Sequence, residues 1–238
     1  MNFSQLPALT LTAALAFGAT AAQAVEVTGG SVGLSYSAFT EDTDLTRLGL
    51  EGSVEFGFTR NLGLQIDTGY SDFGVSGVNT HSLGLHGIYH LDEATSFGAF
   101  YTEEDIEGFD LDIYGLEVGH EANGWNFEGY IAQGEVMDTE GNMLGFKARH
   151  ELANDMGLTG SYDRVDSSGV EVSRVAVRLD RDVAQSTNLF VEVGSAKAEG
   201  AAGNISDPFV GLGGTINFGA ARGATFDVRN LSRLVPGL

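Results

Sequence analysis

The chain has 238 residues, with 12 Lys and Arg against 33 Asp and Glu, so its formal net charge is −21. A charge of this sign argues against nucleic acid as a partner and against docking on an anionic membrane surface through a basic patch. The chain contains no cysteine, which excludes disulfides and thiolate metal sites. Its length suffices for one large domain. The chain is rich in glycine, with 34 Gly, and poor in proline, with 3 Pro.

Residues 1–24 have the features of an export signal. They contain no charged side chain, hold an apolar stretch from Leu9 to Phe17, and end in Ala22-Gln23-Ala24, the small-x-small pattern of a cleavage site. The alternative, a membrane anchor, is disfavoured because this stretch is too short to cross about 30 Å of hydrocarbon as a helix. We therefore expect residues 1–24 to be a secretory signal peptide.

From about residue 29 to residue 219, the sequence repeats one unit about every 32 residues. Each unit combines a polar turn, an alternating strand, a small acidic loop and a returning strand, and two of the turns are Asn123-Gly124-Trp125 and Asn154-Asp155-Met156. This repeat indicates successive β-hairpins with strands of about 11 residues. After residue 25, no segment approaches the roughly 18 consecutive apolar residues of a transmembrane helix.

The predicted strands alternate between an apolar face and a face of charged or very small side chains. Over residues 46–58, for example, Leu48 and Leu50 share one face, whereas Arg47 and Glu51 share the other. A period of two is that of β-strands. We predict about twelve strands, with boundaries good to a few residues. They span residues 29–39, 46–58, 62–73, 80–91, 96–105, 109–121, 125–135, 142–152, 156–166, 170–180, 187–197 and 208–219.

One strand departs from this alternation. Its apolar positions shift from Leu111 and Ile113 to Leu116 and Val118, near Tyr114-Gly115. A β-bulge places one extra residue on one strand and so exchanges its two faces. We therefore expect a bulge at this point.

The strand length and the aromatic residues distinguish a membrane barrel from a soluble sandwich. Strands of about 11 residues, tilted near 40°, cover the roughly 25 Å apolar band of an outer-membrane barrel, whereas soluble strands average about half that length. Aromatic residues lie near both strand ends, such as Phe58, Tyr89 and Trp125 by the short turns and Phe39 and Phe73 opposite. In a soluble sandwich they would fill the core, and the other face would carry more Lys and Glu. We favour a membrane barrel.

With these strands, aromatic positions and export signal, residues 25–219 resemble the porin-like outer-membrane β-barrels of Gram-negative bacteria. The resemblance implies a single up-and-down antiparallel transmembrane β-barrel of about twelve strands, all-β, in the cell outer membrane. It also implies that the short turns face the periplasm, whereas segments such as 40–45 and 198–207 face outward. Outer-membrane lipid and lipopolysaccharide would surround such a barrel.

The C-terminus departs from that family, whose members usually end in an aromatic residue. This chain ends in Val235-Pro236-Gly237-Leu238, although Gly213 to Phe218 resembles the family's insertion signal. We therefore predict that residues 220–238 form a periplasmic tail outside the barrel. A further strand over residues 224–228 is the alternative.

The polar faces of the strands predict a charged lumen. Basic candidates gather on the eighth to tenth strands and acidic candidates lie mainly across the barrel, which would create a transverse field. The basic pore-lining candidates are Lys147, Arg149, Arg174 and Arg178. The acidic pore-lining candidates are Glu51, Glu55, Asp67, Glu117 and Glu128.

These features predict a channel for passive diffusion of ions and small polar solutes, with a mild cation preference at low salt. Eight strands leave an interior that side chains can fill and sixteen leave an aqueous channel, so twelve strands permit either a pore or a packed lumen of paired charges. Many inward Gly and Ser residues favour an open lumen. The alternative function is a non-conducting structural or adhesin-type barrel, and a homo-oligomer is left open.

Catalysis is the third alternative. Some outer-membrane barrels hydrolyse lipids with a Ser-His pair, and only Thr80-His81-Ser82 invites that comparison here. Neighbouring residues of a strand point to opposite faces, so His81 and Ser82 cannot readily pair. His86 and His90 share a face without a third ligand, which makes a poor metal site. We expect no enzyme activity, no metal site and no cofactor.

Overall fold

The structure, a computed structural model, describes residues 25–74, 77–136, 139–201, 203–219 and 223–237. The predicted signal peptide therefore lies outside the described residues. None of the helical segments within these ranges is long and apolar enough to cross a membrane.

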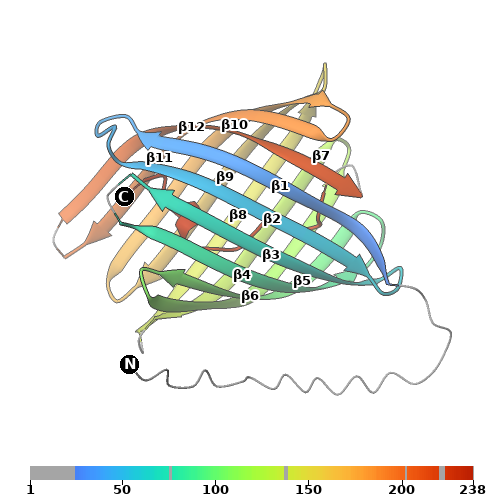
Figure 1. The fold of residues 1–238 in the computed structure, drawn as a ribbon, viewed down its shortest axis with the longest axis horizontal. Helices are drawn as coiled ribbons and strands as arrows, with labels where there is room; N and C mark the ends of the chain where they lie inside the picture. Colours follow the sequence, from blue (N-terminus) through green and yellow to red (C-terminus); the bar gives the residue numbers. More distant parts are fainter. Residues whose placement is uncertain (1–24, 75–76, 137–138, 202, 220–222, 238) are drawn as a thin grey trace, which may run out of the picture.

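The twelve described strands form one closed barrel, in which every strand pairs antiparallel with its neighbours in sequence and β12 pairs with β1 (Figure 1). The predicted up-and-down barrel of about twelve strands is confirmed. Closure leaves no unpaired sheet edge. The strands are β1 (Glu26–Phe39), β2 (Thr46–Gly57), β3 (Leu62–Phe73), β4 (Asn79–His90), β5 (Thr95–Ile106), β6 (Phe109–Ala122), β7 (Trp125–Val136), β8 (Thr139–Leu152), β9 (Met156–Ser167), β10 (Val170–Ala184), β11 (Thr187–Gly200) and β12 (Gly203–Gly219).

Tight turns close several of the hairpins. Asn123 and Gly124, with φ of 53° and 77°, join β6 to β7, and Ser168 and Gly169, with φ of 52° and 78°, join β9 to β10. Two successive residues with positive φ match the right-handed twist of the flanking strands. We call the barrel end that holds residues 58–61 and 123–124 the turn end, and the end that holds residues 40–45 the loop end.

The longest strand shows where the predicted boundaries were wrong. We predicted strands over 187–197 and 208–219, but β11 and β12 stay paired up to Gly200 and Gly203. The hairpin therefore extends the sheet beyond its neighbours at the loop end (Figure 1). The sequence Gly203-Asn204-Ile205-Ser206-Asp207 has little apolar alternation to reveal a strand, because this part of the hairpin is exposed.

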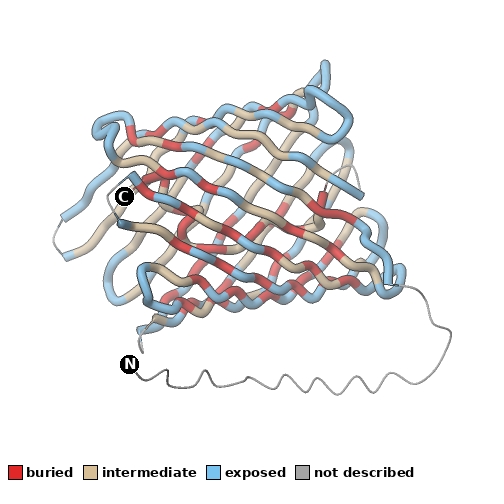
Figure 2. Tube along the Cα trace, viewed as in Figure 1, coloured by how far each residue is buried: buried red, intermediate tan, exposed pale blue. Residues whose placement is uncertain are grey.

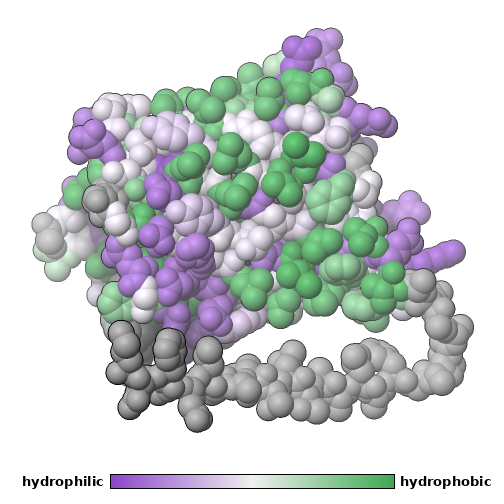
Figure 3. Space-filling model, viewed as in Figure 1, coloured by the Kyte–Doolittle hydropathy of each residue, from purple (hydrophilic) through white to green (hydrophobic). Residues whose placement is uncertain are grey.

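The outer surface of the barrel is a broad apolar band. Outward side chains such as Val32, Leu34, Leu50 and Leu85 are exposed although they are hydrophobic. The face drawn in Figure 3 shows such side chains over β1 to β4. Exposed apolar surface on this scale is what contact with lipid requires.

The expected bulge near Tyr114-Gly115 is absent from both ladders of β6. Tyr101 pairs with Tyr114 and Phe100 with Gly115 without a register shift, and the pairing with β7 is equally regular. The apolar positions change face for another reason. Leu111 and Ile113 point inward and are buried in the lumen, whereas Leu116 and Val118 point outward. A lumen that buries apolar side chains produces the same sequence pattern as a bulge.

The described part of the C-terminal tail, residues 223–237, lies inside the barrel and not outside it. In Figure 2 this segment runs through the lumen with its buried residues coloured red. Phe226, Val228, Asn230, Ser232 and Leu234 are all buried. Their burial corrects our prediction of an external tail, and the segment forms only a short 3₁₀ helix, Ser232–Leu234, in place of the alternative further strand.

Candidate functional site: the lumen and its tail

The tail crosses the lumen from the turn end to the loop end. At the turn end, Gly223 lies against Gly29, where a Cβ would collide with the Gly223 carbonyl. At the loop end, the Ser37 hydroxyl donates a hydrogen bond of 2.7 Å to the Pro236 carbonyl. Gly237 then lies against the backbone of Leu45. The tail therefore spans nearly the full length of the barrel interior.

Side chains of the wall hold the backbone of the tail in its first half. Glu55 accepts a hydrogen bond of 2.8 Å from the Thr225 amide, and Gln65 accepts one of 3.1 Å from the Phe226 amide. The Gln65 side-chain amide also donates to the Phe226 carbonyl at 2.8 Å. Each such bond stabilises docking by about 0.5–1.5 kcal/mol, or more where the acceptor is charged.

The same kind of contact holds the second half of the tail. The fully buried Glu104 carboxylate accepts hydrogen bonds from the backbone amides of Leu231 and Ser232. Asn230 donates its side-chain amide to Ser82 at 3.3 Å. Because most acceptors are carboxylates from β2 to β7, we call this surface the acidic wall. It consists of Glu55, Gln65, Ser82, Glu104, Glu117 and Glu128.

Ion pairs fix the middle of the tail. Arg229 lies between two carboxylates of the acidic wall, 3.0 Å from Glu117 and in direct contact with Glu128. Asp227 accepts from Lys147 at 2.8 Å and from Arg233 at 3.1 Å. Every one of these charges has an opposite partner, which is the condition for burying them.

Apolar side chains of the tail and of the strands pack together near the loop end. Leu234 packs into a buried cluster with the inward side chains Phe100, Leu111, Ile113 and Met143. A second cluster lies around Phe39 and Phe209 on β1 and β12.

Two aromatic positions differ from the sequence prediction. Phe39 and Phe73, which we predicted to lie in an outer aromatic belt, are buried inward-facing side chains. Phe58, Tyr89 and Trp125 are exposed beside the turns, as expected of a belt facing lipid headgroups.

His86 occupies the deepest part of the acidic side. Its ring nitrogens lie 2.8 Å from Asp67 and 2.6 Å from Glu117, and its ring stacks between Phe100 and Phe226 with centroid distances of 5.5 Å and 6.4 Å. His86 thus links Asp67 and Glu117 to Phe226 of the tail. Within the described ranges, no three His, Asp or Glu side chains converge as a metal site requires.

A cavity of about 840 Å³ remains on the other side of the tail. It is bounded mainly by β6 to β12, β1, β2 and the tail, and reaches from Asn123 at the turn end to Pro236 near the loop end. Seven basic and nine acidic side chains line it. Its volume lies within the range of about 300–1,000 Å³ that is typical of small-molecule sites.

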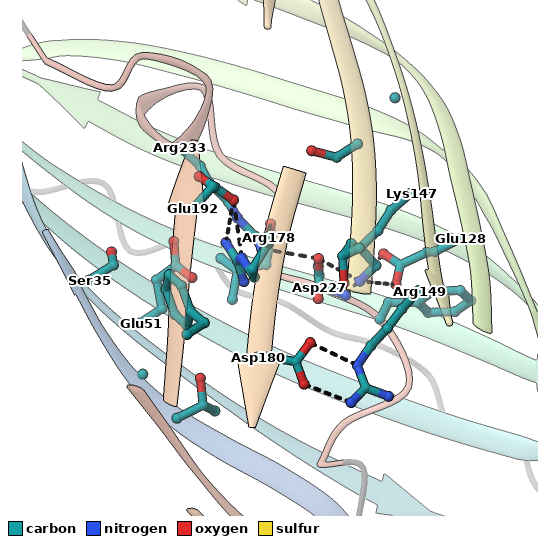
Figure 4. A pocket seen from close by; sticks show the side chains of 18 of the residues that line it. Ser35, Glu51, Glu128, Lys147, Arg149, Arg178, Asp180, Glu192, Asp227 and Arg233 are labelled. Atoms are coloured by element: carbon teal, nitrogen blue, oxygen red, sulfur yellow. Dashed lines mark hydrogen bonds and ion pairs between the residues drawn. The ribbon is translucent and has the colours of Figure 1, made fainter. Parts of the chain in front are cut away.

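Arg149, Arg174 and Arg178 in this cavity are paired with carboxylates of other strands (Figure 4). Arg149 makes a two-pronged contact with Asp180, at 3.1 Å and 2.7 Å. Arg174 and Arg178 both bind Glu192, and the Arg178–Glu192 distance is 3.0 Å. Because each of these basic side chains has a carboxylate close by, the pairs weaken the predicted transverse electric field across the lumen.

The structure places the nine predicted pore-lining residues inside the barrel, in two groups. Lys147, Arg149, Arg174, Arg178, Glu51 and Glu128 line the cavity. Glu55, Asp67 and Glu117 are buried beneath the tail, where they bind it or His86. Their role in permeation stays a prediction.

The Ser-His pair considered for catalysis is separated. His81 is exposed on the outer face, where its ring lies 4.9 Å from that of Tyr70. Ser82 is buried in the lumen and bonds to Asn230. A nucleophile and its base must be within hydrogen-bond reach, so these two side chains do not form a catalytic pair.

Sequence reasoning missed the contacts that involve the tail. Glu104 was not among the predicted lumenal residues, and Asp227, Arg229 and Arg233 were predicted to lie in a tail outside the barrel. One signal was present. The inward faces of β2 to β7 carry more carboxylates than basic groups, and a closed lumen must supply counter-charges.

The fold defined by these observations is that of a porin-like outer-membrane β-barrel. Among solved structures it is similar to the KdgM porin, with a TM-score of 0.60 and 12% identity over 79% of this chain and 99% of that one. It is also similar to the NanC porin, with a TM-score of 0.60 and 8% identity over 79% and 98% of the two chains. An outer-membrane channel from Pseudomonas putida F1 matches with a TM-score of 0.60 and 12% identity over 83% and 97%. No family model and no curated protein sequence matches the chain.

Proposed function

We propose that this chain is an outer-membrane channel through which ions and small polar solutes diffuse passively. The observation that carries the proposal is the cavity of about 840 Å³ inside a closed barrel, lined by charged side chains of both signs. Charged and hydrated walls lower the barrier for polar solutes and raise it for apolar ones. The fold shared with porins and channels supports the same function.

The charges of the cavity support a mild preference for cations. Nine acidic against seven basic side chains leave an excess of negative charge on its lining. The pairs Arg149–Asp180 and Arg178–Glu192 contribute little net potential, so the net formal charge of the lining decides the sign. Lumenal potential of this kind is screened by salt, so the preference is largest at low ionic strength.

Single-channel recording of the mature protein, residues 25–238, in planar bilayers under a salt gradient tests this function. Stepwise currents with a reversal potential of cationic sign are expected. A reversal potential of anionic sign would contradict the predicted selectivity. Folded, lipid-inserted protein that stays silent would contradict the channel function itself.

A second candidate function, a non-conducting structural barrel, is favoured by one observation. The tail occupies part of the lumen, and two apolar clusters lie inside the barrel near its loop end. The same recording separates the two candidates, because a structural barrel gives no current under any condition.

A further inference from the structure

We propose that the tail, residues 223–237, is a displaceable plug bound to the acidic wall as an extended peptide ligand, and that its release opens the loop end of the barrel. The plug rests on the proposed channel function only in those experiments that measure ionic current. It assigns to the acidic wall a binding site for an extended peptide that carries a basic side chain in the position of Arg229.

Side chains of the barrel hold the tail, and the β-sheet does not depend on these contacts. Within the described part of the chain, no backbone–backbone hydrogen bond joins the tail to a strand. The tail is held instead by side chains such as Glu55, Gln65 and Glu104, which accept from its amides. Water and ions can replace such contacts without breaking the sheet. The tail can therefore leave while the closed barrel remains intact.

The acidic wall is selective for one kind of ligand. It binds the backbone amides of Thr225 and Phe226, which any extended peptide offers, and that of Ser232 at the start of the 3₁₀ helix. It binds one side chain by its charge, because Glu117 and Glu128 enclose Arg229. An extended peptide with a basic group at that position fits this wall, and an acidic one does not.

The tail contributes an apolar side chain to the cluster near the loop end of the lumen. The tail's Leu234 completes the apolar cluster around Ile113 and Met143, and Pro236 is bonded to Ser37 near the mouth. Water avoids narrow apolar constrictions, which gate channels by dewetting. When Leu234 leaves, this cluster loses its central side chain and the loop end widens.

Release of the tail also changes the charge of the lumen. Glu104 and Glu117 are buried beneath the tail, Glu128 borders the cavity, and all three receive amides of the tail or Arg229. Without the tail they lose these partners, so the lumen attracts more cations from solution, although Lys147 and His86 still bind Glu128 and Glu117. The open state is therefore more cation-selective than the plugged state.

A reversible disulfide tests the plug in the full mature chain. The hydroxyl oxygens of Ser71 on β3 and Ser232 in the tail lie 3.3 Å apart, and the chain has no cysteine of its own. The double variant Ser71→Cys, Ser232→Cys should lock the tail when oxidised and free it when reduced. We expect at least a tenfold loss of open-channel events on oxidation, restored by a reductant.

A matched disulfide between two barrel strands controls for effects of oxidation and reduction that do not involve the tail. The hydroxyl oxygens of Ser31 on β1 and Ser53 on β2 lie 2.8 Å apart, and this pair joins two strands without touching the tail. Oxidation of Ser31→Cys, Ser53→Cys should leave the gating unchanged. Equal currents through the oxidised and reduced forms of the Ser71, Ser232 variant would overturn the plug while leaving the channel function standing.

A second measurement needs no current. In the single variant Ser232→Cys, the thiol replaces a side chain that is buried in the lumen. A soluble maleimide should label it only when the tail undocks, and excess synthetic peptide with the sequence of residues 223–238 should accelerate labelling by occupying the vacated wall. Labelling without any current supports the plug and contradicts the channel function. Absence of labelling over hours in folded protein overturns the plug.

Discussion

Replacement of Arg229 by Gln is the sharpest single perturbation of the tail. Arg229 lies 3.0 Å from Glu117, contacts Glu128, and stands over the ring of Tyr130 at 4.5 Å. Removal of one member of a buried ion pair costs about 3–5 kcal/mol, because the partner charge stays buried. Here two other groups limit the loss, since Lys147 still binds Glu128 at 3.0 Å and His86 still binds Glu117 at 2.6 Å.

We therefore expect Arg229→Gln to weaken tail docking by about 2–3 kcal/mol, which corresponds to a shift of about 30- to 150-fold in the docking equilibrium. The assay is the rate of maleimide labelling in the Ser232→Cys background. When docking and undocking are fast compared with labelling, this rate follows the undocked population.

The control for this substitution is Arg164→Gln. Arg164 makes ion pairs with Asp166 and Glu171 on the outer face, and its side chain is 38% exposed. Exposed pairs contribute about 0–1 kcal/mol, so the labelling rate should hardly change. If Arg229→Gln alters the rate by less than about threefold, the claim that this ion pair holds the tail is refuted.

Three further predictions address packing, selectivity and membrane insertion. Leu234→Ala removes the tail's side chain from the buried cluster and should cost about 2–4 kcal/mol of docking, seen as faster labelling of Ser232→Cys with an unchanged barrel by circular dichroism. Arg178→Gln leaves Glu192 with one basic partner fewer and should move the reversal potential toward the cation limit at low salt; no change would show that this pair lies outside the conducting path. Val177→Arg on the lipid face of β10 should destabilise the folded barrel by about 2–4 kcal/mol in a bilayer, whereas Ser161→Arg in the lumen should cost much less, as measured by urea-dependent unfolding.

The strands could be predicted from the sequence because lipid imposes a simple rule on them. Outward positions within the apolar band are mostly apolar, so alternation such as that of Leu48 and Leu50 against Arg47 and Glu51 continues through the membrane. Outside the apolar band the side chains no longer alternate, and the strand boundaries could not be predicted there. The start of β12, at Gly203, lies in an exposed part of the hairpin, and its side chains carry no such pattern.

The inward side chains could be predicted only in part, because their polarity depends on what packs against them in the lumen. Leu111 and Ile113 are apolar because Leu234 packs on them, not because lipid does. Their partner is more than 100 residues away in the sequence. A pattern within one strand cannot show such a contact, so the change of face at β6 resembled a bulge. The same reasoning explains why Phe39 and Phe73 resembled an outer aromatic belt.

The tail itself divides the lumen into two parts with different physical properties. On one side, the acidic wall and His86 are buried, and their charges are matched by Arg229 and by amides of the tail. On the other side, Arg149 and Arg178 border an accessible cavity and are matched by Asp180 and Glu192 of the barrel strands. These two pairs do not involve the tail and remain when it leaves. The acidic side loses Arg229 and the amides of the tail at the same time and becomes more negative, so selectivity and opening are coupled through one segment of the chain.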